Sequence, residues 1–245
     1  MQVTSRQLYI DILTELVKEE SPTLYMEDYL YYINKAVSDY IKSRYELYET
    51  TQQLSDDLRF WKKPYKTNKL QVPISDIHTK VGDKIAHSYR HVLSCIVEAA
   101  ITRPMIQCPQ AVGERVMYKA TRVSSDTKAG LLDNAYLQPA FYRPYYDIID
   151  NSISIRIGRP DPKVEITQVI IEYLCNPTSI ELTEEQVEDD EDTSDVLEFS
   201  KDVAEEIVKI ALKLILERGS PNRLQPFMAV NAAISDVSTG MKGGK

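Results

Sequence analysis

The stretch Ser152-Ile-Ser-Ile-Arg-Ile157, Gly158-Arg-Pro-Asp-Pro162 and Val164-Glu-Ile-Thr-Gln-Val-Ile-Ile-Glu-Tyr-Leu174 decides the fold class. Its first part alternates isoleucines with polar residues, which is the period-2 pattern of a half-buried strand. The Gly- and Pro-containing part is typical of a turn, and the last part is rich in residues that favour strands. We therefore predict a β-hairpin over residues 152–174. Residues 116–123 fit a further strand, and residues 92–101 fit either a buried strand or a short helix, of which we favour the strand.

Helical patterns flank this β region on both sides. Apolar residues recur every three or four positions over residues 5–19 and 26–51, which indicates two amphipathic helices. Pro22 separates them and predicts a short turn, and hence an N-terminal helical hairpin. Helical periodicity returns over residues 200–218 and 226–234. The order of helices, strands and helices predicts an α+β fold.

Changes in composition divide the chain into five segments, which we expect to form one folded domain overall. The acidic segment carries so many carboxylates that we expect a solvated, mobile loop there rather than a calcium site. The predicted segments are an N-terminal helical hairpin (1–60), a mixed β-rich portion (61–182), an acidic loop (183–199), C-terminal helices (200–235) and a flexible arm (236–245).

Length and charge restrict the function. The chain has 245 residues and a formal charge of −8, and this acidic balance argues against wrapping nucleic acid, which requires clustered cations. No apolar run reaches the roughly 20 residues of a membrane span, and the first ten residues do not resemble a signal peptide. We therefore expect assembly in a cytoplasm, without a membrane partner. Cys95, Cys108 and Cys175 are expected to be reduced thiols.

Motifs for catalysis are missing from the sequence. It contains no phosphate-binding glycine loop, no G-x-S-x-G elbow and no recognisable Cys–His pair, so we expect a non-enzyme without a cofactor. One alternative stays open. Asp83, His87 and His91 are spaced i, i+4, i+8, which on a helix would place them on one face, where they could bind zinc and serve a metal-dependent hydrolase.

Tyrosines are unusually frequent, with 16 against four phenylalanines. Several lie in the long helix predicted over residues 26–51, on more than one of its faces. A two-helix hairpin cannot bury all of these rings, and exposed aromatic surface usually binds a partner. We therefore expect self-association through this helix.

Several segments resemble the ring proteins of crAss-like tailed bacteriophages. The N-terminal part of the resemblance is carried by Tyr29-Leu-Tyr-Tyr-Ile-Asn-Lys-Ala-Val-Ser-Asp-Tyr-Ile-Lys-Ser-Arg-Tyr45 and by residues 49–59. The C-terminal part lies in Leu182-Thr-Glu-Glu-Gln186, residues 191–199 and Asn222-Arg-Leu-Gln225. Together with looser matches in the middle, the similarity covers most of residues 26–235.

This resemblance implies a structural virion protein at the head–tail junction of a short-tailed phage. Such proteins form homo-oligomeric rings below the portal, and their architecture is similar to tubular tail adaptors with a helical bundle, a β portion and a C-terminal helix. It implies a dodecameric ring, with the portal and other neck or tail rings as partners and genomic DNA as passing cargo. A tail-assembly chaperone or scaffold that leaves before maturation is the other structural alternative.

Two sets of residues are the candidate sites of such a ring protein. The acidic loop would line the channel and repel the DNA backbone, and its candidates are Glu188, Asp189, Asp190, Glu191 and Asp192. Tyrosine, tryptophan and arginine dominate interface energetics. The candidate subunit or partner contacts are Tyr29, Tyr32, Arg44, Tyr45, Tyr48, Asp56, Asp57, Arg59 and Trp61.

Overall fold

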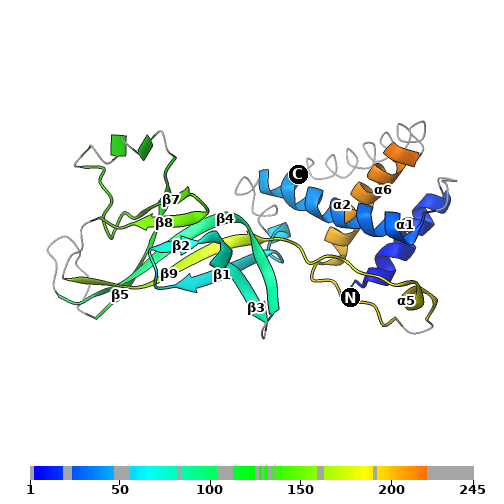
Figure 1. The fold of residues 1–245 in the computed structure, drawn as a ribbon, viewed down its shortest axis with the longest axis horizontal. Coiled ribbons are helices and arrows are strands. Elements are labelled where there is room, and N and C mark those ends of the chain that lie inside the picture. The colour runs from blue at the N-terminus through cyan, green and yellow to red at the C-terminus, as the bar shows by residue number, and fades with distance from the viewer. Residues whose placement is uncertain are drawn as a thin grey trace, which may run out of the picture. The chain divides into compact units, whose positions relative to one another are not determined.

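A computed structural model gives the fold of the chain (Figure 1). It describes residues 3–18, 24–46, 56–81, 84–103, 113–124, 127–128, 130–131, 134, 136–158, 163–189 and 192–219. The fold is α+β, as predicted. The chain divides into two compact units rather than the expected single domain. The helical unit comprises residues 1–60 and 179–245, and the β unit comprises residues 61–178.

The helical unit is built around a contact between the two ends of the chain. Its helices are α1 (Ser5–Lys18), α2 (Met26–Glu46), α5 (Glu184–Glu188) and α6 (Lys201–Gly219). Helix α6 packs against both α2 and α1 (Figure 1). The predicted N-terminal hairpin is not confirmed, because α6, which comes much later in the sequence, packs against both N-terminal helices. Their apolar faces are buried in this three-helix arrangement.

Tyrosines are part of the core of the helical unit. Tyr29 and Tyr40 are almost fully buried on α2. The Tyr29 ring meets Tyr9 of α1 edge-on, with 4.9 Å between ring centroids, and its hydroxyl donates to the Ser5 carbonyl oxygen at 3.3 Å. Burial, followed by the charges of Tyr9 and Asp11, raises the pKa of the Tyr29 phenol. The group therefore stays protonated as a donor across the physiological pH range.

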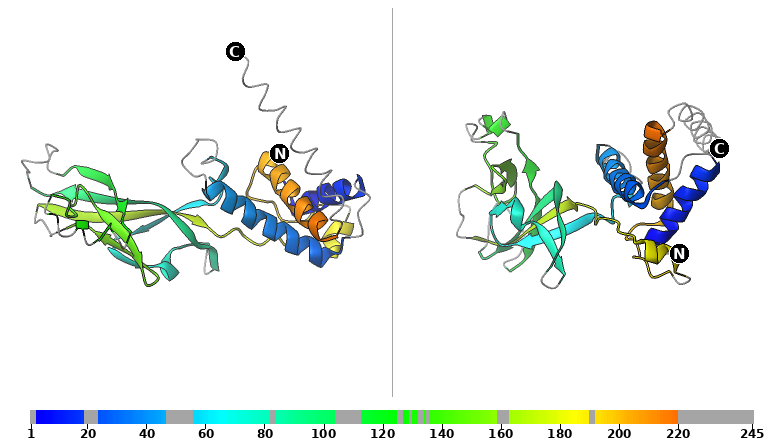
Figure 2. Two further views of the ribbon diagram at one scale, coloured as in Figure 1. Left: turned by 90° about the horizontal axis from the view of Figure 1, so that it is seen from above. Right: turned by 45° about the vertical axis from the view of Figure 1, so that its right-hand side comes forward.

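The described residues of the β unit form two sheets, which Figure 2 shows from two further sides. In the first sheet the order is β1–β9–β4–β3, with β5 also paired to β4; the second has the order β2–β8–β7–β6. All described pairs are antiparallel except β6 with β7. The strands are β1 (Lys62–Thr67), β2 (Gln71–Pro73), β3 (His78–Val81), β4 (Lys84–Ile101), β5 (Arg115–Lys119), β6 (Thr121–Arg122), β7 (Tyr145–Ile149), β8 (Ser152–Arg156) and β9 (Val164–Cys175), with a 3-10 turn at Ile74–Asp76.

Strands β4 and β9 are paired in the centre of the first sheet. Alternate β4 residues Val97, Ala99 and Ile101 are fully buried, and Val97 pairs with the equally buried Val169 of β9. Side chains of paired residues point to the same face of a sheet, so one face is apolar and covered. The predicted strand over residues 92–101 is confirmed, as the C-terminal half of β4.

The predicted hairpin over residues 152–174 is wrong, because its two strands belong to different sheets. Strand β8 pairs with β7 and β2, whereas β9 pairs with β4 and β1. Gly158 lies in the connection at a φ of +81°, and a Cβ there would lie 2.2 Å from the Pro139 carbonyl oxygen. Only glycine fits this close approach without displacing the backbone. A side chain at position 158 would therefore collide with the backbone of Pro139.

A similar crossing splits the strand predicted over residues 116–123. The segment forms β5 in the first sheet and β6 in the second, with Ala120 between them. The Ala120 amide donates to the Cys95 carbonyl at 2.7 Å, and the next amide, of Thr121, donates to the Pro144 carbonyl at 2.9 Å. Consecutive backbone groups thus bond to different sheets. Periodicity located the strand residues but not the change of partner.

The acidic segment is ordered where it is described, so the expectation of a mobile loop is wrong for those residues. Thr183 and Gln186 form a capping box that begins α5, satisfying two backbone donors at once. The segment then pairs with the N-terminus: the Leu197 amide donates to the Val3 carbonyl, and the Ser5 amide to the Asp195 carbonyl. The hydrogen bonds to the N-terminus compensate the entropy lost by ordering so polar a segment. Asp190 and Glu191 lie outside the described residues.

Candidate functional site

The predicted interface residues fall into three groups in the structure. Tyr29, Tyr32 and Trp61 are buried inside the chain, so their assignment to exposed contact surface is corrected: they are core residues. Asp56 and Arg59 are exposed, and the Arg59 guanidinium lies 4.7 Å from the centroid of the Phe60 ring. The remaining candidates are Tyr45, which is half-buried, Tyr48, which lies outside the described residues, and Arg44 and Asp57, which contact each other.

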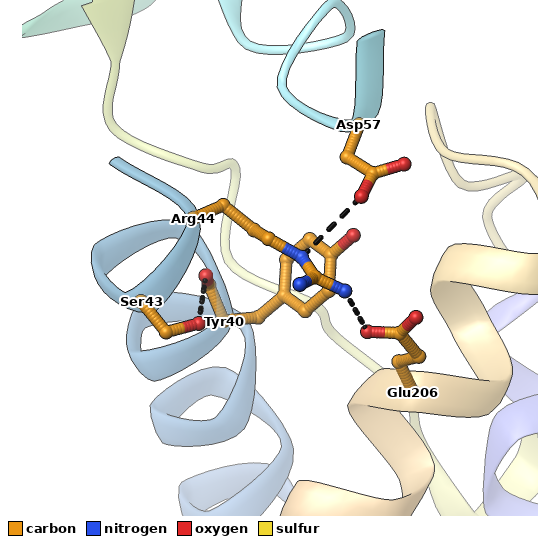
Figure 3. A network of polar contacts seen from close by, with 5 residues as sticks. All are labelled: Tyr40, Ser43, Arg44, Asp57 and Glu206. Carbon is orange, nitrogen blue, oxygen red and sulfur yellow. Dashed lines mark hydrogen bonds and ion pairs between the residues drawn. The ribbon is translucent and has the colours of Figure 1, made fainter. Parts of the chain in front are cut away.

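Arg44 is the centre of a polar network in the helical unit (Figure 3). Its Nε lies 3.3 Å from an Asp57 carboxylate oxygen, and its Nη2 donates to the Glu206 carboxylate. The guanidinium also covers the Tyr40 ring, 5.2 Å from its centroid, which adds a cation–π contact. One cation thus joins α2, α6 and the turn at residues 56–57. The geometry identifies Arg44 as a structural clamp of the helical unit.

Replacing Arg44 with methionine should destabilise the helical unit by about 1–2 kcal/mol. The change keeps an unbranched apolar stem but leaves two carboxylates without their cation, and the partial exposure of all three groups reduces the cost. Urea denaturation followed by circular dichroism at 222 nm measures the change. The control is Lys201→Met, which removes an exposed 3.9 Å pair with Glu205 and should change nothing measurable. If the two variants were equally stable, Arg44 would not stabilise the helical unit through these contacts.

Of the predicted acidic loop residues, Glu188 and Asp189 are exposed, whereas Asp192 is held by hydrogen bonds. Thr4 Oγ1 donates to Asp192 Oδ2 at 2.6 Å, and the Ser194 amide donates to Oδ1 at 3.1 Å. Hydrogen bonds from the Ser194 hydroxyl and then from Thr4 hold the pKa of Asp192 below its ordinary value. Thr4 Oγ1 also accepts from the Gln7 amide and so caps α1. The carboxylate therefore ties the acidic segment to the start of α1.

Acid should loosen this attachment. Because the pKa of Asp192 is lowered in the folded state, its contribution to stability is complete above the ordinary value of 3.8 and is lost as the pH falls through the lower folded value. Hydrogen exchange, corrected for intrinsic rates, should show the amides of Ser5 and Leu197 losing protection below about pH 4. In Asp192→Asn this pH step should disappear. A step of unchanged size in the variant would exclude Asp192 as its source.

The structure contradicts the helical arrangement assumed for the metal site. His87 and His91 lie on strand β4 rather than on a helix, and the pairing register shifts between Tyr89 and His91, so the assumed i, i+4 helical face does not exist. Asp83 lies outside the described residues. Within the described ranges, no group of three or more His, Cys, Asp or Glu side chains could hold a metal ion.

A cavity in the β unit was not predicted from the sequence. It has a volume of about 560 Å³ and is lined by Arg122, Ser124, Thr127, Lys128 and Asp147, among others; we call it the Asp147 pocket. Asp147 comes from β7, and its side chain is only 7% exposed. A carboxylate inside the apolar run Tyr145-Tyr-Asp-Ile-Ile149 was the one sequence signal, since an unpaired buried charge is costly.

The Asp147 carboxylate is surrounded by cations. Lys128 Nζ lies 2.6 Å and Arg156 Nε 3.6 Å from its Oδ2 atom. Arg122 also lines the pocket and is exposed. The pocket lining therefore holds two cations, Arg122 and Lys128, against the one carboxylate of Asp147, a local excess of one positive charge. Ser124 and Thr127 add hydroxyl groups to the lining. Such a lining favours an anionic group.

An exposed aromatic loop, residues 136–143, adjoins the pocket. Pro139 of this loop lines a small cavity together with Lys128 and Asp147. The loop is fixed by Arg143, whose Nη2 donates to the Gln138 carbonyl at 2.9 Å, and by the hydroxyl of Tyr145, which donates to the Leu137 carbonyl at 3.0 Å. Its exposed apolar side chains are Tyr136 (89% exposed), Leu137 (41%) and Tyr142 (49%). Exposed tyrosines beside arginine are typical of protein interfaces.

The two units carry charge of opposite sign. The β unit contains 16 lysines and arginines against 11 acidic residues, a net charge of +5. The helical unit contains 13 against 26, a net charge of −13. The overall charge of −8 therefore conceals a strong asymmetry within the chain.

Comparison with known proteins gives no family assignment. The chain matches no protein-family model and no curated protein significantly.

No helix in the described parts of the chain combines the length and the apolar character needed to cross a membrane.

Proposed function

We propose that this chain is a non-enzymatic structural protein that forms a homo-oligomeric ring in the head–tail connector of a short-tailed phage virion. The ring is one section of the channel through which the genome passes. Its partners are further copies of itself, in the dodecameric arrangement that the resemblance implies. It also contacts the portal or neighbouring neck and tail rings. The helical unit, the β unit and the late helix α6 support a comparison with tubular tail adaptors.

The observation that carries this proposal is the opposite charge of the two units. A closed ring repeats one heterologous contact, in which a surface of one copy meets a different surface of the next. A chain with a β unit at +5 and a helical unit at −13 supplies two such surfaces that attract each other between copies. Contacts between like units are disfavoured by the same charges.

The acidic excess of the helical unit also suits a DNA channel. Carboxylates that face the lumen repel phosphates, so the genome passes without binding to the wall. Exposed carboxylates of the helical unit, including Asp189, are available for this task in the described ranges. Stable contacts between the wall and the bases or phosphates would hold the genome and oppose its passage.

Negative-stain electron microscopy of the purified protein, alone and mixed with the phage portal, tests the proposal. We expect rings, or rings stacked on portal. Protein that remains monomeric under both conditions contradicts the proposal. Mass spectrometry of purified virions separates it from the chaperone alternative, because a ring protein stays in the mature particle and a chaperone or scaffold is missing from it.

A further inference from the structure

We propose that the Asp147 pocket and the adjoining loop 136–143 are the docking site for the acidic helical unit of a second copy of this chain. This inference rests on the proposed function, because it identifies the contact that closes the ring. The docking site contains an anion-favouring pocket and exposed tyrosines on the same part of the β unit.

The pocket can receive carboxylates without losing its own structure. Lys128 and Arg156 pair with the buried Asp147, and Arg122, which also lines the pocket, is exposed. Its guanidinium is therefore available for a bidentate contact with an incoming carboxylate. The tyrosines of the loop provide apolar area around this charged centre, which is the usual composition of an interface with strong anchor residues.

The helical unit presents its carboxylates on a fixed surface. Glu184, Glu185 and Glu188 are exposed on α5, and the Arg6 guanidinium donates to the Val187 carbonyl at 3.0 Å, which holds α5 against α1. The capping box fixes the start of the same helix. A preorganised acidic surface loses little entropy on binding. These carboxylates therefore belong to the subunit contact in this proposal, in place of the channel-lining role predicted for part of the acidic segment.

Charge reversal tests the docking site in the full-length protein. Arg122→Glu should weaken self-association at least tenfold, measured by sedimentation velocity, while its circular dichroism spectrum stays that of the wild type. The matched control is Lys66→Glu, which makes the same charge change at an exposed position of β1 in the same unit and should assemble normally. Salt should weaken the wild-type assembly, because exposed charges are screened.

A mixing experiment identifies the partner surface. A variant with Glu184→Lys, Glu185→Lys and Glu188→Lys should also fail to assemble alone, because its lysines would meet Arg122. Mixed with Arg122→Glu, it should restore rings in which the two variants alternate, since every contact in such a ring pairs opposite charges. Restored assembly in an equimolar mixture supports both the docking site and α5 of a second copy as its occupant.

The failures are distinguishable. Normal assembly of Arg122→Glu overturns the docking site and leaves the ring proposal intact. Loss of assembly in both variants without rescue on mixing overturns the pairing of α5 with the pocket. A wild-type protein that stays monomeric with and without portal overturns the proposed function itself.

Discussion

Tyr29→Ala should destabilise the helical unit by about 3–5 kcal/mol, the range for removing a large buried ring. Tyr29 is fully buried, and its ring is packed edge-on against Tyr9. The truncation leaves a cavity between α1 and α2 and removes the donor to the Ser5 carbonyl. Urea denaturation monitored at 222 nm reports mainly on the helices and so measures this loss.

A matched control separates the core tyrosine from a surface tyrosine of the same helix. Tyr31 is 58% exposed, so Tyr31→Ala should change the stability by no more than about 0.5 kcal/mol. Tyr29→Phe keeps the ring and removes only the hydrogen bond, at a cost of about 1 kcal/mol. If Tyr29→Ala were as stable as Tyr31→Ala, the core position of Tyr29 would be refuted.

The thiol of Cys95 should be almost inert in the folded protein. It is fully buried on β4, and burial raises its pKa to about 12. Because the thiolate is the reactive form, the fraction available near pH 8 falls about a thousandfold relative to an ordinary cysteine. Cys175 is equally buried. Labelling by a disulfide reagent should therefore be fast only after unfolding in urea.

The measurement is best made in a Cys108→Ser background, because Cys108 lies outside the described residues. The control is Ile85→Cys in the same background. Ile85 is 60% exposed on the same strand as Cys95. The cysteine introduced at this position should therefore be labelled at the rate of an exposed thiol. Rapid stoichiometric labelling of Cys95 in the native protein would show that the first sheet opens at β4.

The sequence by itself determined the local structure of this protein. Amphipathic periodicity located α1, α2 and α6, and the period-2 pattern located β8, because these patterns record which side of an element is buried. The C-terminal part of β4 was located by its apolar run instead. The same patterns placed the α+β class correctly. They did not show what covers the buried side. Tyr29 and Tyr32 were therefore assigned to a subunit contact, although they are buried inside the chain in the helical unit.

Only the tertiary structure decided which elements are partners. The strands β8 and β9 follow each other in sequence but join different sheets, since each finds its pairing partners among strands from other parts of the chain. Residues distant in sequence also meet only on folding, as Arg44 meets Glu206 and Lys128 meets Asp147. Periodicity is a property of neighbouring residues, whereas the sheet partners, the Arg44 clamp and the Asp147 pocket depend on contacts between segments far apart in the chain.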